Sequence, residues 1–432
     1  MADPGGAWWR GRRGGIAAAV AALLVIAGAS FAAGYALRAN GDGDGARSAT
    51  AETPSPAAGG GSTAAARATA AAPTTAPAQA DTPAPAVAAT AAPRATPTAM
   101  LLPALTPAGP RPPPTAGLPV PWVGVNNWAL GAASDVHGDC GGASEALLEQ
   151  KMTRWRAAGT DVVRFAAYQS FATDAAHQRN WAAFDRVFAS AQAHGIRLIP
   201  VLGNNWTDCD YWGAYPGAQG KDTGTPLACG GSGNWYDIGY RQPYNGYITG
   251  YRQWVADVVG RYAHSPALAA WELVNEPWES CIHDFFVDVI GVLRAADPAT
   301  PISLGSGGGG EAWSRGDGYR RETALADWAT VHDYGHPDDP LPVCPGKNCL
   351  RTDLADAGAL GKPLYVGEAG IWDDANCDSP ARADRYRARM RAAFDAGASG
   401  YILWAYNERA PAGECGLDFG PDSPIMKLFA EF

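Results

Sequence analysis

The sequence lacks several patterns that mark common classes of enzyme and binding protein. No two of its eight cysteines have C-x-x-C spacing, so a zinc site is not expected. No G-x-S-x-G motif is present, which argues against a serine esterase. Residues 1–117 carry eight arginines and five acidic residues, which gives this segment a net charge of +3. Because the whole chain has a formal charge of −10, residues 118–432 carry −13. An acidic domain without a basic stripe argues against a nucleic-acid partner.

Residues 39–117 have almost no aromatic or large aliphatic side chains before Leu101 and consist mainly of Ala, Thr, Pro, Gly and Ser. Such a segment cannot bury enough apolar surface to fold, and it predicts a disordered, fairly extended linker. The remaining residues, 118–432, have a length that suits one large catalytic domain.

The N-terminal region contains an uncharged, mostly apolar run at residues 14–37, with Arg10, Arg12 and Arg13 before it and Arg38 after it. Its length is sufficient for a membrane-spanning helix, which needs about 20 residues. We therefore expect residues 1–13 to be cytoplasmic and residues 14–38 to be an anchor with the remainder outside the cell. A cleaved signal peptide, which would give a secreted protein, remains the alternative.

All eight cysteines follow this apolar run. An even number in an exported chain predicts up to four disulfides, although eight cysteines allow 105 pairings. Cys209 with Cys229 and Cys344 with Cys349 are the simplest local pairs.

Strand-like and helix-like segments alternate eight times after residue 118, which predicts a closed (β/α)₈ barrel. The candidate strands cover residues 122–125, 161–165, 197–202, 268–272, 302–304, 328–332, 364–367 and 400–404. The candidate helices cover residues 143–158, 181–194, 247–262, 285–296, 352–360 and 380–396.

Two glutamates follow short apolar runs: Glu276 in Trp-Glu-Leu-Val-Asn-Glu-Pro and Glu368 in Leu-Tyr-Val-Gly-Glu-Ala-Gly. In a (β/α)₈ barrel, catalytic groups lie at the C-terminal ends of strands, where both would fall. Glycoside hydrolysis needs such a pair, in which one carboxyl group protonates the leaving oxygen and the other is ionised.

The chain from about residue 120 onward resembles glycoside hydrolase family 5, a family of retaining glycosidases. Five markers occur in the family's order: Val162-Val163-Arg164-Phe165, Asn275-Glu276-Pro277, His332-Asp333-Tyr334, Glu368 and Trp404. The resemblance implies Glu276 as acid/base and Glu368 as nucleophile. It implies supporting roles for Arg164, Asn275, His332 and Tyr334, and it implies no cofactor. No metal is expected either, because the spacing of His332, His336, Asp338 and Asp339 is not a zinc pattern and a turn after a strand explains these residues better.

The same roles follow from physical arguments. Burial and a facing carboxylate should raise the pKa of Glu276 so that it holds its proton. Arg164 should favour the ionised form of Glu368, and Tyr334 should orient that carboxylate. His332 is expected to tune Glu276 or bind a sugar hydroxyl, and Asn275 to hold the 2-hydroxyl of the reacting sugar.

The substrate is expected to be a β-linked polysaccharide or oligosaccharide. The sequence around Asn204 and Glu276 looks most similar to endo-β-1,4-mannanases, with an endo-β-1,4-glucanase as the first alternative. A catalytically inactive carbohydrate-binding surface protein is the alternative of another class. Trp404 is predicted to form the floor of the reacting subsite, and the other predicted substrate-binding residues are Asn204, Asn205, Trp206, Trp278 and Trp372. The protein is expected to be monomeric.

Overall fold

The structure is a computed structural model. It describes residues 117–132, 145–205, 209–210, 235–244, 246–277, 282–308, 318–335, 341, 350–372, 379–408 and 416–432. The predicted anchor at 14–38, and the predicted linker apart from Gly117, lie outside these residues. Within the described ranges no helix is long and apolar enough to cross a membrane.

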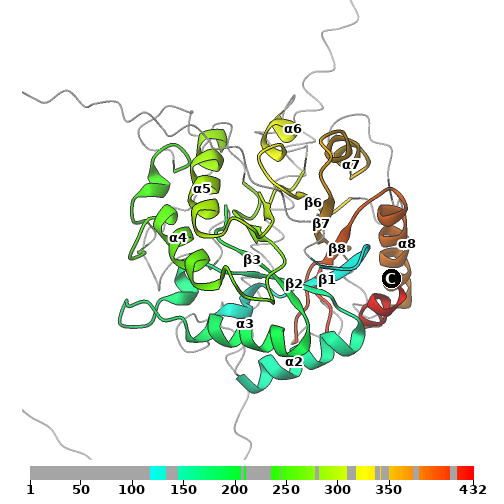
Figure 1. The fold of residues 1–432 in the computed structure, drawn as a ribbon. Helices are drawn as coiled ribbons and strands as arrows, with labels where there is room; N and C mark the ends of the chain where they lie inside the picture. Colours follow the sequence, from blue (N-terminus) through cyan, green and yellow to red (C-terminus); the bar gives the residue numbers. More distant parts are fainter. Residues whose placement is uncertain are drawn as a thin grey trace, which may run out of the picture. The chain divides into compact units, whose positions relative to one another are not determined.

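Eight parallel strands form one sheet in the order β5-β4-β3-β2-β1-β8-β7-β6. Figure 1 shows the strands inside a surround of helices. The strands are β1 (Trp122–Asn126), β2 (Val162–Ala166), β3 (Arg197–Val201), β4 (Trp271–Glu272), β5 (Ile302–Ser303), β6 (Ala329–Asp333), β7 (Leu364–Ala369) and β8 (Gly400–Leu403). Each overlaps a predicted strand, so the predicted eightfold barrel is confirmed.

The barrel closes between β5 and β6, the two ends of the strand order. The Trp328 amide donates to the carbonyl of Ile302 at 3.1 Å, and the His332 amide donates to the carbonyl of Gly307 at 3.2 Å. Strand β4 is shorter than its apolar run predicts, because residues before Trp271 pair with β3 only through the isolated bridge between Leu198 and Leu268.

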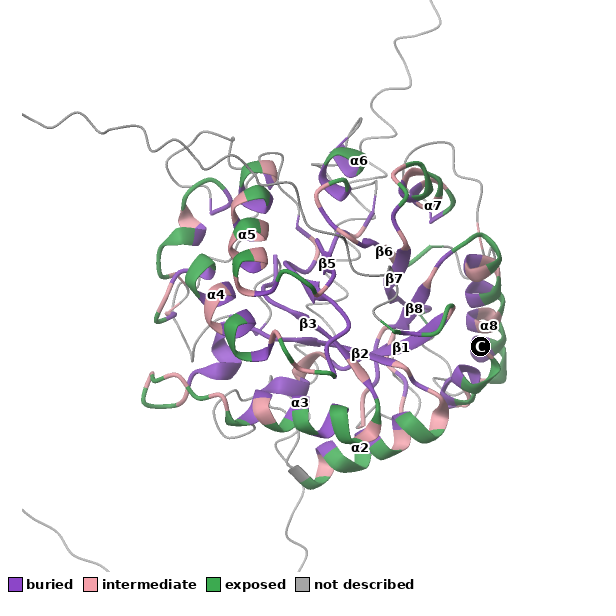
Figure 2. Cartoon of the chain, in the orientation of Figure 1, coloured by how far each residue is buried: buried purple, intermediate pink, exposed green. Residues whose placement is uncertain are grey.

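Helices surround the strands in a ring, with buried faces toward the barrel and exposed faces outward (Figure 2). They are α2 (Glu145–Ala158), α3 (Ala182–His194), α4 (Tyr251–Tyr262), α5 (Ile282–Ala296), α6 (Gly318–Thr323), α7 (Leu350–Ala359) and α8 (Pro380–Asp395). Short 3₁₀ segments are η1 (Trp128–Gly131), η3 (Gln169–Ala172), η4 (Gly239–Arg241) and η6 (Pro424–Glu431). The short helix α6 was not predicted.

The strands are buried over most of their length, as expected when helices cover a parallel sheet. Part of the interior is filled by the rings of Trp122, Trp328 and Tyr365, whose centroids lie 5.6 to 6.2 Å apart. Gly400 makes this packing possible, because a Cβ atom at that position would lie 2.1 Å from the Trp122 ring. These tryptophans therefore belong to the core, below the C-terminal ends of the strands.

Candidate active site

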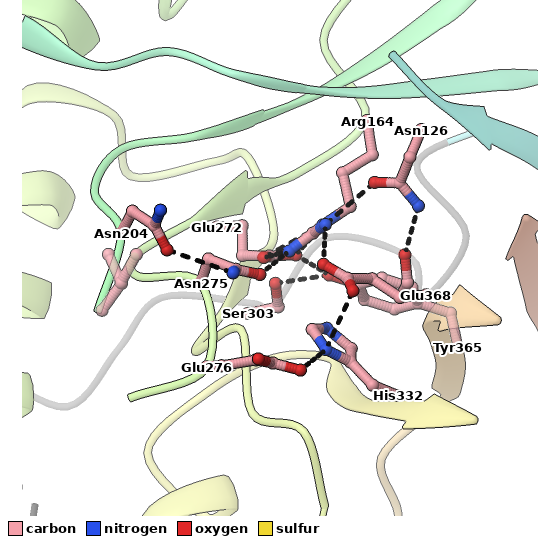
Figure 3. A network of polar contacts seen from close by, with 12 residues as sticks. Asn126, Arg164, Asn204, Glu272, Asn275, Glu276, Ser303, His332, Tyr365 and Glu368 are labelled. Carbon is pink, nitrogen blue, oxygen red and sulfur yellow. Dashed lines mark hydrogen bonds and ion pairs between the residues drawn. The ribbon is translucent and has the colours of Figure 1, made fainter. Parts of the chain in front are cut away.

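Glu276 and Glu368 face each other across His332 (Figure 3). Nδ1 of His332 lies 2.6 Å from Oε1 of Glu276 and 3.5 Å from Oε2 of Glu368. One carboxylate oxygen of each glutamate and a ring nitrogen of His332 all lie within 4.8 Å of one another. This upper limit on the distance between the two carboxylate oxygens fits the short spacing of roughly 5–5.5 Å in retaining glycosidases better than the roughly 6.5–9.5 Å of inverting ones.

Hydrogen bonds to two neighbouring segments, one after β3 and one after β5, fix the backbone at Glu276. The amide of Asn275 donates to Gly203 at 2.8 Å, and the amide of Glu276 donates to Gly305 at 2.9 Å. Glu276 has a φ of 46°, in the left-handed region that non-glycine residues rarely adopt. Strained backbone of this kind clusters at functional sites.

Arg164, on β2, is fully buried and uses all five of its N–H donors. Nη1 donates to Glu368 at 2.7 Å and to Asn126 at 2.8 Å, while Nη2 donates to Glu272 at 2.5 Å and to Asn275 at 2.7 Å. Nε lies 3.1 Å from Oε1 of Glu272. One cation therefore fixes two carboxylates and two amides that come from β1, from β4 and its C-terminal end, and from β7.

A second layer lies behind Arg164 and contains Glu272, which sequence reasoning missed. Its carboxylate accepts from the hydroxyl of Tyr365 at 2.7 Å, and this hydroxyl lies 2.7 Å from that of Ser303. Glu272 is completely buried, and its position four residues before Glu276 places a charge within an otherwise apolar strand. A buried charge needs a partner, so a glutamate within an apolar strand could have indicated that Glu272 belongs to a polar network.

Asn126 was also missed. Its Oδ1 accepts from Arg164, and its Nδ2 donates to the carbonyl of Gly367 at 3.0 Å. It therefore connects the arginine to the strand that carries Glu368. A polar residue at the end of an apolar strand was the only signal in the sequence.

The predicted asparagines differ in position. Nδ2 of Asn275 donates to Oδ1 of Asn204 at 3.2 Å, so these two belong to the same network as Arg164 (Figure 3). Asn205 is 2% exposed, and its side chain accepts from the hydroxyl of Tyr236 at 2.7 Å. The side chain of Asn205 is therefore engaged by Tyr236, outside the network of Arg164.

Four charged or titratable groups surround the carboxylate of Glu368: Arg164 from β2, Glu276 after β4, His332 on β6 and Tyr334 after β6. Burial raises the pKa of Glu368 above its ordinary value of 4.5, and the charge of Glu276 adds to the rise. His332 and Arg164 oppose it, as does the hydroxyl of Tyr334, which donates to Oε2 at 2.6 Å. The expectation that Arg164 favours the ionised form is met in direction, but burial outweighs it.

His332 is buried between the two carboxylates. Burial lowers its pKa, but the charges of Glu368 and Glu276 raise it by more, so that the pKa of His332 lies above its ordinary 6.5. The imidazole therefore has a tendency to be protonated close to Glu276. A proton held at Nδ1 lies within hydrogen-bonding distance of Oε1 of Glu276.

Trp404 follows β8 and is partly exposed. Its ring packs edge-to-face against Trp128 at 5.4 Å, and the Arg164 guanidinium lies 5.4 Å from the centre of the Trp128 ring. Trp404 is thus linked to the polar network through one aromatic ring. Trp372 lies after β7 and is 50% exposed, whereas Trp206 and Trp278 lie outside the described residues.

Glu276, His332 and Glu368 form the kind of cluster that could hold a metal ion. Hydrogen bonds also account for these three groups, because Nδ1 of His332 is engaged by Oε1 of Glu276, and Glu368 accepts from Arg164 and Tyr334. The cluster offers two carboxylates and one imidazole, a set that also serves proton transfer. The sequence predicts no metal, and that remains a prediction.

Cys209 is disulfide-bonded. It is the one cysteine among the described residues, and the other seven cysteines lie outside them. The predicted pairing with Cys229, like that of Cys344 with Cys349, therefore stays a prediction.

The sequence is similar to fungal mannan endo-1,4-β-mannosidases. It is 26% identical over 255 residues to the probable mannan endo-1,4-β-mannosidase F of Aspergillus flavus, covering 54% of this chain and 50% of that protein. It is 28% identical over 246 residues to mannan endo-1,4-β-mannosidase A of Podospora anserina, covering 53% of this chain and 60% of that protein. The chain thus spans about half of the length of the curated relatives it matches.

The fold is similar to that of solved mannanases. The endo-β-1,4-mannanase of Thermotoga petrophila superposes with a TM-score of 0.53 at 19% identity, covering 73% of this chain and 76% of that chain. The endo-1,4-β-mannanase of Rhizomucor miehei gives a TM-score of 0.53 at 16% identity, covering 72% of this chain and 93% of that chain. At these identities the likeness concerns the fold alone.

The family model for cellulase (glycosyl hydrolase family 5) matches residues 119–410, which is more than half of the chain. This range contains both glutamates and all five sequence markers. The chain therefore belongs to glycosyl hydrolase family 5.

Proposed function

We propose that this protein is a retaining endo-β-1,4-mannanase. The observation that carries the proposal is the pair Glu276 and Glu368, whose carboxylate oxygens approach within 4.8 Å around His332. That spacing supports a double displacement, in which one glutamate attacks the anomeric carbon as a carboxylate and the other, as a carboxylic acid, protonates the leaving oxygen. The similarity to named mannan endo-1,4-β-mannosidases supports mannan as the substrate.

Glu368 is the proposed nucleophile. Arg164 and Tyr334 each donate to one of its oxygens, which fixes the orientation of the carboxylate and favours its charged form. Attack forms a covalent glycosyl-enzyme intermediate, and Glu276 gives its proton to the departing sugar oxygen. Glu276 then accepts a proton from the water that releases the sugar from Glu368.

The neighbours of the pair have proposed roles of their own. Nδ1 of His332 holds Oε1 of Glu276 in place, and proton sharing between them matches the protonation change that Glu276 undergoes. Asn275 is held by Arg164 and Asn204 near the acid/base, where it binds the 2-hydroxyl of the reacting sugar. Trp404 forms the floor under that sugar.

We propose that residues 118–432 form the catalytic domain and that it acts outside the cytoplasm as a monomer. The disulfide at Cys209 supports an oxidising location, since mesophilic cytosolic proteins rarely keep such bonds. The segment at 14–38 would either anchor the protein or be cleaved, and the linker at 39–117 would separate the barrel from the membrane.

The test is reducing-sugar release by the full chain from β-mannan and from soluble β-glucan, with Glu368→Gln as the matched control. Gln keeps the shape of the side chain and removes its charge. Release from mannan that is lost in the control, with the β-anomer as the first product, is the expected result. Preferred release from β-glucan would favour the glucanase alternative. Glycan binding without any release would indicate a binding protein.

A further inference from the structure

An exposed indole lies four residues after Glu368. Among the described residues, the exposed large apolar side chains include two aromatic rings, Trp372 at 50% and Tyr334 at 42%. Tyr334 contacts Glu368 directly through its hydroxyl, and Trp372 is carried by the chain that leaves β7 just after Glu368. Tyr334 therefore presents aromatic surface beside the proposed nucleophile, and Trp372 adds a second exposed ring on the segment that follows Glu368.

Contacts through glycines connect the two rings. A Cβ atom on Gly370 would lie 2.5 Å from the Tyr334 ring and 2.8 Å from a methyl carbon of Leu417, so both side chains close around that glycine. The edge of the Trp372 ring would lie 3.2 Å from a Cβ atom on Gly416. Gly416 has a φ of +52°, which favours glycine, and the indole lies against the space where a side chain would otherwise project.

Arg382, in the first turn of α8, ties the two segments under Trp372 together. It is fully buried, and its Nε donates to the carbonyl of Ile371 at 3.0 Å. Its Nη atoms donate to the carbonyls of Leu417 and Asp418 at 2.8 Å, and to that of Gly416 at 3.3 Å. One side chain thereby holds the residue before Trp372 and the segment on which its ring lies.

The amide of Ile371 is held as well, because it donates to the hydroxyl of Tyr386 at 2.8 Å. Both polar backbone groups of Ile371 are therefore bound by buried side chains of α8. The residue directly before the half-exposed Trp372 is in this way held on both of its backbone polar groups. Such anchoring is required of a binding platform, since a mobile ring loses entropy on binding.

We propose that Trp372 is a platform for a sugar unit of the polysaccharide outside the reacting position, and that Arg382 is the positioning residue that holds it. The inference rests on the proposed function, because it needs a glycan chain that extends beyond the bond at Glu276 and Glu368. The negative face of the indole attracts the C–H groups on the flat face of a β-linked sugar. The ligand class is a neutral β-1,4-linked oligosaccharide long enough to reach past the reacting sugar.

The test is calorimetric binding of a β-1,4-manno-oligosaccharide to the full chain carrying Glu368→Ala, which prevents turnover. In this background, Trp372→Ala is expected to weaken binding about tenfold, which corresponds to ~1.4 kcal/mol. Trp372→Phe should recover part of the loss, because it keeps a smaller aromatic face. Arg382→Lys should weaken binding about threefold, since a point charge cannot serve the carbonyls that the planar fork reaches.

A double substitution separates positioning from general destabilisation. If Arg382 acts through Trp372, Arg382→Lys should have no further effect on affinity when Trp372→Ala is already present. The matched control is Arg294→Lys, since Arg294 on α5 also donates to a backbone carbonyl, that of Thr300 just before β5. Because that position is at the opposite ends of the strands from Glu368, the control should leave affinity unchanged.

Two results would overturn the inference. An affinity of Trp372→Ala within about twofold of the parent would contradict the role of Trp372 as a platform, because loss of the indole contact is expected to weaken binding about tenfold. Losses that add in the double variant would remove the positioning role of Arg382. Neither result touches the proposed function, which is decided by reducing-sugar release from chains with Glu368 intact.

Discussion

The hydroxyl of Tyr334 should set the acid limb of the pH profile. It donates to Oε2 of Glu368 at 2.6 Å, and this hydrogen bond lowers the pKa of a carboxyl group that burial raises above 4.5. Glu368 must be ionised to attack, so activity is lost as the pH falls through its raised pKa. Tyr334→Phe removes a donor to the charged form, and the pKa of Glu368 should rise further.

The size of this change follows from the strength of the bond. A hydrogen bond to a charged group contributes about 1.5–3 kcal/mol, which is about one to two pKa units at 1.36 kcal/mol per unit. Glu368 keeps its bond from Arg164 on the other oxygen, so we use the lower end of this range. We therefore expect the acid limb of kcat/KM to move upward by about one pH unit.

The assay is kcat/KM on soluble mannan across the acid range, since this parameter reports ionisations of the free enzyme. Tyr401→Phe is the matched control, because the hydroxyl of Tyr401 donates to Asp333 at 2.7 Å and not to Glu368. The control should leave the acid limb in place. An acid limb that is unchanged or lower in Tyr334→Phe would refute the argument that this bond stabilises the ionised form of Glu368.

Three further predictions concern the same network. Arg164→Met leaves Glu272 and Glu368 buried without their cation. It should therefore reduce the free energy of unfolding, measured by urea titration, by about 3–5 kcal/mol. A loss below about 1 kcal/mol would contradict the central role of the arginine. Glu276→Ala should slow hydrolysis of mannan by roughly 10²–10⁴-fold but slow an activated aryl glycoside much less, because a phenolate leaves without a proton; equal losses on both substrates would argue against Glu276 as the acid. Incubation with EDTA should leave kcat/KM unchanged, because His332 and the two glutamates are explained by hydrogen bonding; a loss restored by added Zn²⁺ would show a metal centre.

The fold could be predicted from the sequence because its strongest signals are local. Each strand is a short run of apolar residues, and in a parallel barrel both faces of such a run are buried. The short helix α6, Gly318–Thr323, escaped because its six residues give too little periodicity to recognise.

The two glutamates at the centre of the site could also be predicted from the sequence, but the buried residues that hold them in place could not. Glu276 and Glu368 each end an apolar run, and the barrel topology places such residues together. Glu272 depends on a partner 108 residues away, and no local pattern predicts that Arg164 would contact both Glu272 and Glu368. Long-range polar contacts of this kind follow from strand register, which the sequence specifies only through the folded barrel.

The backbone of Glu276 shows why local rules fail where the chemistry is. Its φ of 46° would suit Gly, Asn or Asp, and a longer side chain there costs roughly 1–2 kcal/mol. The conformation persists because the flanking amides of Asn275 and Glu276 are held by the carbonyls of Gly203 and Gly305, on two different neighbouring segments. Stability alone would select a small residue at this position. The glutamate is therefore explained by function and not by stability: this backbone conformation places its carboxylate 2.6 Å from His332.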